Sequence, residues 1–218
     1  MLEARNLTCQ RGDRVLFSGL SFTLSSGELL QVAGPNGSGK TSLLKLLCGI
    51  SSPLEGEIRW TGQNARKQGE AFRENLLYIG HHNAVKEDLS ALENLQIAAT
   101  LAGQALTEDQ ALDALDRIGL LGREYLPAKV LSQGQKRRVT LARLLVSKAP
   151  LWILDEPLTA LDVKAIALIQ SRLAEHLATQ QRLVVASVDL AQRGRVQRRI
   201  AGDQYEGSAR RLPPARNA

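Results

Sequence analysis

Residues 34–41 read GPNGSGKT, and this glycine-rich stretch is the strongest indication of the fold. They complete the pattern G-x-x-x-x-G-K-[ST], in which glycines let the backbone wrap closely around an anion. A short apolar run, LLQVA (29–33), precedes the loop, and leucines at helical spacing follow it in SLLKLLCGI (42–50). The order strand, glycine-rich loop, helix predicts a loop that binds phosphate.

The chemistry of such a loop follows from its backbone. Successive N–H groups point at phosphate oxygens, and the N-terminus of the next helix adds partial positive charge. We expect Lys40 to reach the β- and γ-phosphates of ATP and Thr41 to ligate Mg²⁺. The predicted nucleotide site is therefore the whole loop: Gly34, Pro35, Asn36, Gly37, Ser38, Gly39, Lys40 and Thr41.

Two acids follow the apolar segment LWIL (151–154), which is typical of a strand buried on both faces. Carboxylates at the C-terminal end of a parallel strand lie where open α/β sheets bind ligands. Asp155 is predicted to hold Mg²⁺, and Glu156 to polarise the attacking water as a general base. Without the phosphate loop, the same pair would be unremarkable acids in a loop.

Strand patterns alternate with helix patterns along the chain, which predicts an α/β fold with a mostly parallel sheet. Residues 1–33 indicate strands, whereas Ser90 with Glu93 and Thr107 with Gln110 have the spacing of capping boxes that begin helices. We expect a single ATPase domain over residues 1–190, with a helical subdomain near 81–130.

Composition excludes several classes of protein. No run of apolar residues in the 218-residue chain is long enough to cross a membrane, so work at a membrane requires a partner. Most of the net charge of +6 lies in residues 192–218, with seven arginines against two acids, so the charge says little about the partner of the body, and no nucleic acid is expected as a partner. Cys9 and Cys48 are expected to be reduced, buried thiols.

The segments LSQGQKRR (131–138) and LWILDEPLTALD (151–162) resemble the signature, Walker B and D-loop series of ABC-type ATPases. The resemblance covers roughly residues 1–186. Within that family the chain is similar to the haem-exporter ATPases of cytochrome c maturation, in MLEARNLTC (1–9), NLLYIGHHNAVKEDLSALENL (75–95) and PLWILDEPLTALD (150–162).

The resemblance implies a dimer. The signature serine and glycine of the family contact the γ-phosphate held by the other subunit, and here they are Ser132 and Gly134, with Gln135 expected in the same nucleotide site. Ser132 also fits a plain helix N-cap with Gln135 closing a capping box, and both interpretations can hold. The D-loop match falls on Ala160, Leu161 and Asp162, which would touch the opposite subunit.

Two positions depart from the family pattern. Where the family has an aromatic residue stacked on adenine, this chain has Arg11, whose guanidinium plane can also stack on a base. Where the family has the Q-loop glutamine, the chain has His81, which would bond the attacking or metal-bound water. The alternative is that His81 and His82 are ordinary surface residues, and neither is expected to bind a metal.

The third departure is the ending. The family places a switch histidine after the strand that follows Walker B, but here Val188 and Asp189 follow, and no histidine occurs after His176. The Arg-rich tail, residues 191–218, is expected to be disordered. It is either a frame-shifted ending, a divergent tail on a slow enzyme, or the mark of a subunit that binds ATP and barely cleaves it.

The predicted function is ATP binding and hydrolysis for an ABC transporter, by a homodimer peripheral to the cytoplasmic face of the inner membrane. It would drive a separate integral membrane subunit, by resemblance in haem export for cytochrome c biogenesis. The alternatives are the ATPase of another small ABC transporter, a nucleotide switch with little turnover, and a soluble factor acting on nucleic acid or ribosomes.

Overall fold

The computed structural model describes residues 1–187, 195–200 and 210–211. These residues form two compact units, which are described separately. The first unit contains residues 1–78, 150–156 and the described residues from 176 onward, and the second contains residues 79–149 and 157–175. The second unit is wider than the helical subdomain expected near 81–130, because the helix that begins at the signature packs with the two helices before it.

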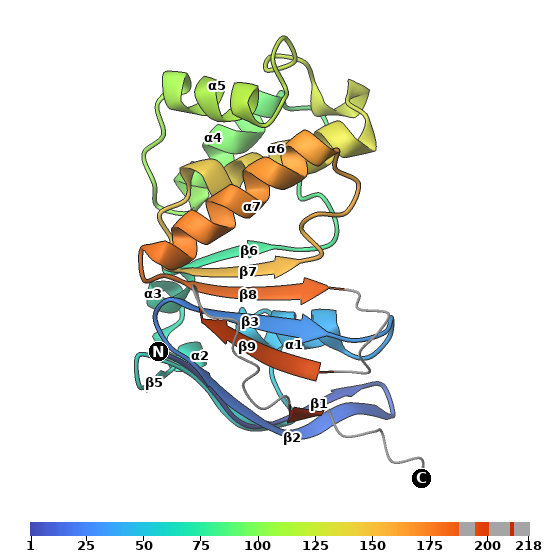
Figure 1. Cartoon of the computed structure of the whole chain (residues 1–218), viewed down its shortest axis with the longest axis vertical. Helices are drawn as coiled ribbons and strands as arrows, with labels where there is room; N and C mark the ends of the chain where they lie inside the picture. Colours follow the sequence, from blue (N-terminus) through green and yellow to red (C-terminus); the bar gives the residue numbers. More distant parts are fainter. Residues whose placement is uncertain (188–194, 201–209, 212–218) are drawn as a thin grey trace. The chain divides into compact units, whose positions relative to one another are not determined.

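A six-stranded sheet in the order β10-β9-β3-β8-β7-β6 carries the nucleotide loop (Figure 1). Strands β3 (Glu28–Ala33) and β7 (Leu151–Asp155) both pair in parallel with β8 (Arg182–Ser187), as the sequence predicts. All five residues of β7 are buried. Helix α1 (Lys40–Leu47) follows the loop, and β6 (Leu76–Ile79) lies at one edge.

The other edge of this sheet contains residues of the predicted tail. Strand β9 (Arg195–Ile200) pairs antiparallel with β3, and β10 (Arg210–Arg211) pairs antiparallel with β9. These two segments are strands, in contrast to the disorder expected for residues 191–218, because pairing satisfies backbone groups at the edge of β3. The remaining tail residues, and Val188 and Asp189, lie outside the described part of the chain.

A second sheet, antiparallel and in the order β2-β1-β4-β5, belongs to the same unit. Its strands are β1 (Leu2–Arg11), β2 (Arg14–Leu24), β4 (Glu55–Trp60) and β5 (Gln63–Asn64), and the short helices α2 (Ala65–Gln68) and α3 (Glu70–Arg73) follow. The sequence indicated strands here but not that they form a separate sheet. One apolar core, which includes Leu7, Leu30, Leu44 and Ile153, joins both sheets and α1.

Close approach of backbones fixes one glycine in this sheet. Gly56 has a φ of 85°, and a Cβ added there would lie 2.3 Å from the carbonyl oxygen of Arg5 and 2.4 Å from that of Asn6. The pairing of β1 with β4 changes register beside this point, between Arg5 and Thr8. Only a residue without a side chain fits there.

The second unit is built around helices α4 (Ala91–Leu101), α5 (Glu108–Arg117) and α6 (Gln133–Val146), which pack against one another. Each of them begins with a complete capping box, and those at Ser90 and Thr107 have the partners that the sequence predicts. A 3-10 turn, η1 (Ala128–Val130), precedes α6, and α7 (Val163–Ala178) begins in this unit.

Candidate nucleotide site

The glycine-rich loop connects β3 to α1 as predicted. Gly39 is the N-cap of α1 and has a φ of 92°, and Gly37 has a φ of 78°, conformations that favour glycine. A Cβ on Gly39 would lie 3.2 Å from the Cβ of Leu16, so the β1–β2 hairpin approaches the loop closely. No sequence pattern predicts this contact, since Leu16 has the character of an ordinary strand residue.

Lys40 points back over the loop. Its ammonium donates to the carbonyl oxygens of Gly34 at 2.8 Å and Pro35 at 3.2 Å, and the residue is buried. An ammonium group has three N–H donors, and these two contacts hold it over the loop. Lys40 is therefore positioned by the loop's own backbone, close to where the loop would hold a phosphate.

The Walker B aspartate meets the end of the loop. Thr41 Oγ1 donates to Asp155 Oδ2 at 2.7 Å, although the residues are 114 positions apart in the sequence. Asp155 closes β7 and is 1% exposed, whereas Thr41 is exposed. A hydroxyl and a carboxylate oxygen in contact are the hard ligands that Mg²⁺ takes beside a nucleotide, so the pair fits that ion.

Two neighbouring groups respond to the charge of Asp155. Burial raises the pKa of Tyr78 to about 12, and electrostatic interactions with Cys48 and Asp155 add to the effect. Burial also raises the pKa of the Cys48 thiol, with Asp155 adding to the shift. Both Cys48 and Cys9 are free, buried cysteines, as the sequence predicts.

A buried polar atom in the loop also fits a nucleotide. Ser38 Oγ is buried and has no hydrogen-bond partner within the described residues. A buried hydroxyl without a partner costs about 1–3 kcal/mol, a penalty that a bound phosphate oxygen would remove. The loop of residues 34–41 therefore has the polar groups of an anion site, with one still to be satisfied.

The predicted base has an unusual backbone. Glu156 has a φ of 49°, a left-handed conformation that costs a residue with a side chain about 1–2 kcal/mol. Its N–H donates to the carbonyl oxygen of Ala186 in β8 at 3.1 Å, which holds the conformation in place. Strain held in this way is concentrated at functional sites, and here it falls on the residue predicted to activate water.

The predicted signature residues lie in the second unit, at the start of α6. Ser132 is the N-cap: its Oγ accepts from the Gln135 N–H at 3.2 Å, and Gln135 Oε1 accepts from the Ser132 N–H at 2.9 Å. The capping-box interpretation is thus confirmed. The contact of these residues with the γ-phosphate of the other subunit stays a prediction. A Cβ on Gly134 would lie 3.4 Å from the carbonyl oxygen of Ala160, so α6 begins beside the D-loop.

The two departures from the family pattern are both at the surface. Arg11 is exposed at the end of β1, where it pairs in register with Arg14. His81 is exposed in the second unit, and its ring lies edge-on to that of His82 with 5.4 Å between centroids. Their roles at the nucleotide stay predictions. In the described residues, no group of three or more His, Cys, Asp or Glu side chains could hold a metal ion.

The last histidine of the chain has a packing role. His176 is buried in α7, its ring stacks on that of Trp152 with 3.7 Å between centroids, and its Nε2 lies 3.1 Å from the carbonyl oxygen of Arg182. It is therefore not a candidate for the missing switch histidine.

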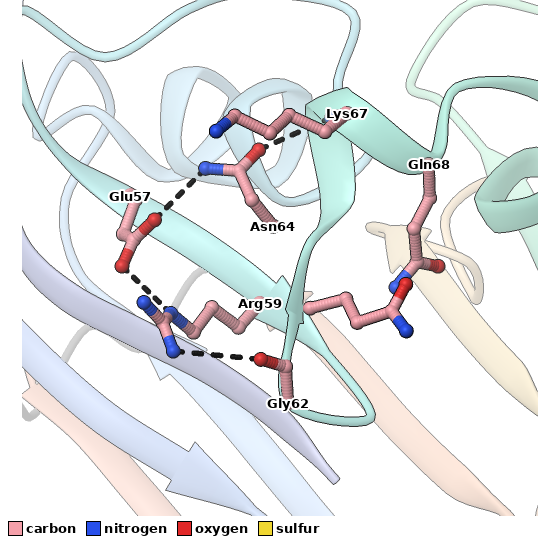
Figure 2. Close-up of a pocket in the computed structure, with 7 residues that line it drawn as sticks. Glu57, Arg59, Gly62, Asn64, Lys67 and Gln68 are labelled. Atoms are coloured by element: carbon pink, nitrogen blue, oxygen red, sulfur yellow. Dashed lines mark hydrogen bonds and ion pairs between the residues drawn. The ribbon is translucent and has the colours of Figure 1, made fainter.

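A polar pocket of about 390 Å³ lies elsewhere, at the β4–β5 hairpin and α2 (Figure 2). Glu57 is at its edge and accepts hydrogen bonds from Arg59 at 2.7 Å and Asn64 at 2.9 Å. The pKa of Glu57 is lowered by its hydrogen bonds to Asn64 and Arg59. None of the residues that line this pocket belongs to the loop of residues 34–41 or to the end of β7, so it is not the predicted nucleotide site.

Comparison with known proteins agrees with the geometry. Residues 17–159 match the ABC transporter family. The cytochrome c biogenesis ATP-binding export protein CcmA of Nitrosomonas europaea is 58% identical over 196 residues, covering 86% of this chain and 92% of the relative. The CcmA protein of Escherichia coli K12 is 46% identical over 209 residues, covering 92% of this chain and 99% of the relative.

Solved structures show the same fold. A putative ABC transporter ATP-binding protein from Pyrococcus furiosus superposes with a TM-score of 0.75 at 28% identity, covering 86% of this chain and 91% of that one. A dimeric ATP-binding cassette in a post-hydrolysis state, bound to ADP and Pi, has a TM-score of 0.76 at 24% identity, covering 87% and 89%.

The loop, the Walker B acids and the fold define an ABC-type ATPase, an enzyme that binds and hydrolyses ATP. The chain belongs to the ABC transporter family and, within it, to the cytochrome c biogenesis ATP-binding export proteins, CcmA.

Proposed function

We propose that this chain is the ATP-hydrolysing subunit of an exporter that serves cytochrome c biogenesis. The observation that carries the proposal is the contact of Thr41 with Asp155 at 2.7 Å, at the end of a complete phosphate loop and next to Glu156. The link to cytochrome c biogenesis rests on relatives described as cytochrome c biogenesis ATP-binding export proteins, which match most of the chain.

ATP binding uses the first unit. The loop amides and the N-terminus of α1 receive the phosphates, and Lys40 neutralises part of their charge. Thr41 and Asp155 would hold Mg²⁺, which when bound neutralises charge on the phosphate oxygens. These residues orient the γ-phosphate for in-line attack by water.

Glu156 accepts a proton from that water. It follows the end of β7 with a strained backbone that the hydrogen bond to Ala186 holds in place. A positioned general base of this kind contributes about 10²–10⁴ in rate. In our proposal His81 orients the same water or a metal-bound water, and Arg11 stacks on the base of the nucleotide.

The complete site requires two copies of the chain. Ser132, Gly134 and Gln135 would contact the γ-phosphate in the other subunit, where the N-terminus of α6 adds partial positive charge. ATP then closes a homodimer, and hydrolysis with product release lets it open. The dimeric cassette with the same fold supports this arrangement.

The motion would drive an integral membrane subunit, with this chain held at the cytoplasmic face of the inner membrane. The support is the description of the relatives as export proteins. Among the helices that the structure describes, none is long and apolar enough to span a bilayer.

A second candidate is a nucleotide switch with little turnover. The observation that favours it is the lack of any histidine after His176, whose ring is buried against Trp152. Residues Val188 and Asp189, where the switch histidine would follow, lie outside the described residues.

Phosphate release from Mg-ATP by the wild type and by Glu156→Gln, with the membrane partner present, tests the proposal. We expect the substitution to lower kcat about 10²–10⁴-fold while ATP binding is retained, since it removes only the base. If both proteins release the same negligible amount of phosphate, the hydrolysis proposal fails and the nucleotide-switch proposal takes its place. Co-purification with an integral membrane protein separates an exporter subunit from a soluble factor.

A further inference from the structure

One guanidinium group ties three segments of the second unit together. Arg138 lies on α6, six positions after Ser132. Its Nη1 donates to the carbonyl oxygen of Gly119, just after α5, at 3.0 Å. Its Nη2 donates to Asp162 Oδ2, in the D-loop segment, at 2.5 Å. The two N–H groups of one planar fork thus reach two different segments.

The contact with Gly119 depends on the absence of a side chain. A Cβ built on Gly119 would lie 2.5 Å from Arg138 Nη1, and the residue has a φ of 84°. A glycine just after a helix is a common helix-ending residue, and Gly119 follows the C-cap of α5. In the structure it also admits the guanidinium to the backbone carbonyl.

Asp162 is bound on both of its oxygens. Oδ1 accepts from the Ala165 N–H at 2.9 Å, at the first turn of α7, while Oδ2 accepts from Arg138. The hydrogen bond from Ala165 and the charge of Arg138 lower the pKa of Asp162, so the carboxylate stays ionised. The D-loop segment is therefore fixed to α7 by one oxygen and to α6 by the other.

The same two segments also meet at the N-terminus of α6. The predicted signature glycine, Gly134, approaches the carbonyl oxygen of Ala160, whose own φ is 62°. Arg138, about one helical turn further along α6, adds a charge-assisted hydrogen bond to this close approach.

We propose that Arg138 is a positioning residue that fixes the D-loop relative to the signature residues. Both segments would form the surface offered to the second copy of the chain, and Arg138 keeps them in one geometry. The inference rests on the proposed function, since it assumes that these segments act in trans. Lysine is a poor substitute, because one ammonium lacks the fixed fork that reaches both acceptors.

The test uses the full chain with Glu156→Gln, which retains ATP, as the parent protein. Arg138→Ala is added, and the ATP-dependent dimer is measured by sedimentation, while the affinity of the monomer is measured with a fluorescent ATP analogue. A symmetric dimer contains the contact twice, so a loss of about three-fold per site raises the dimer dissociation constant about ten-fold. Affinity for nucleotide stays unchanged, because the phosphate loop is untouched.

Arg117→Ala is the matched control. Arg117 forms an exposed ion pair with Asp113 along α5, at 3.6 Å, and is expected to leave the dimer within about two-fold of the parent. Arg138→Lys should recover part of the loss. Asp162→Asn should reproduce it, because the amide oxygen can still cap α7 while the charge that binds Arg138 is gone.

The outcomes separate the two proposals. A parent protein that forms no dimer with ATP would overturn the site in trans, and with it the role of Arg138. If the parent dimerises and the Arg138→Ala and Asp162→Asn variants dimerise with the same dissociation constant, the role of Arg138 alone is overturned. Thermal unfolding of each variant shows whether a loss of dimer reflects unfolding, and Arg138→Lys and Asp162→Asn decide the question if Arg138→Ala does not fold.

Discussion

Thr41 and Asp155 are joined by a hydrogen bond of 2.7 Å across 114 positions of sequence. We expect Asp155→Asn to raise the Mg²⁺ concentration needed for hydrolysis roughly 10–100-fold, since the charge beside the ion is lost. Thr41→Val should act in the same direction, and Thr41→Ser should restore the wild-type requirement. Activity titrated with Mg²⁺ at saturating ATP measures the effect. An unchanged requirement in Asp155→Asn would place the metal elsewhere.

Arg11 is predicted to stack on the base of the nucleotide. Arg11→Ala should weaken ATP binding about two- to five-fold, the size of an exposed cation–π contact. Arg14→Ala is the control, because Arg14 is the exposed partner of Arg11 in the β1–β2 register. Equilibrium binding of ATP and GTP to each protein gives both affinity and selectivity. Equal affinities in wild type and Arg11→Ala would refute the stacking.

His81 and His82 are adjacent, exposed and in ring contact, so each serves as the control for the other. His81→Ala should lower kcat roughly 10²-fold with little change in KM, because it removes a group that orients water. His82→Ala should leave both constants close to wild type. Steady-state ATPase assays compare the two. A loss confined to His82→Ala would move the Q-loop role to that residue.

Gly56 and Gly62 have the same φ of 85° but different surroundings. Gly62→Ala should cost about 1–2 kcal/mol of unfolding free energy, from backbone strain alone. Gly56→Ala should cost about 1–3 kcal/mol more, since its Cβ meets the carbonyl groups of Arg5 and Asn6. Chemical denaturation gives both values. Equal costs would show that β1 and β4 can separate without penalty.

Both cysteines should resist thiol reagents in the native protein. Burial raises the pKa of Cys9, and burial together with the charge of Asp155 raises that of Cys48. A raised pKa leaves less of the reactive thiolate at any given pH, so labelling at pH 8 should be slow. Denaturation should expose two thiols to rapid reaction. Fast labelling of the native protein would contradict the burial of these side chains.

Features set by neighbours in the sequence could be predicted without a structure. The glycine-rich loop, the acids at the end of β7 and the capping boxes at Ser90 and Thr107 all depend on residues within a few positions of one another. Their backbone conformations follow from local sterics and hydrogen bonding. The parallel pairing of β3, β7 and β8 also followed, because alternating strands and helices allow few other arrangements.

Contacts between groups far apart in the sequence could not be predicted without the structure. The composition of strands β1, β2 and β4 does not indicate whether they extend the main sheet or form a separate one. The structure places them in a second, antiparallel sheet. Arg138 reads as one of several basic residues after the signature, yet its fork reaches Gly119 and Asp162. Contacts of this kind depend on how the chain packs, which no local pattern encodes. Local sequence is therefore enough to predict the chemistry of the phosphate loop, whereas packing sets the contacts that hold the loop and the D-loop in place.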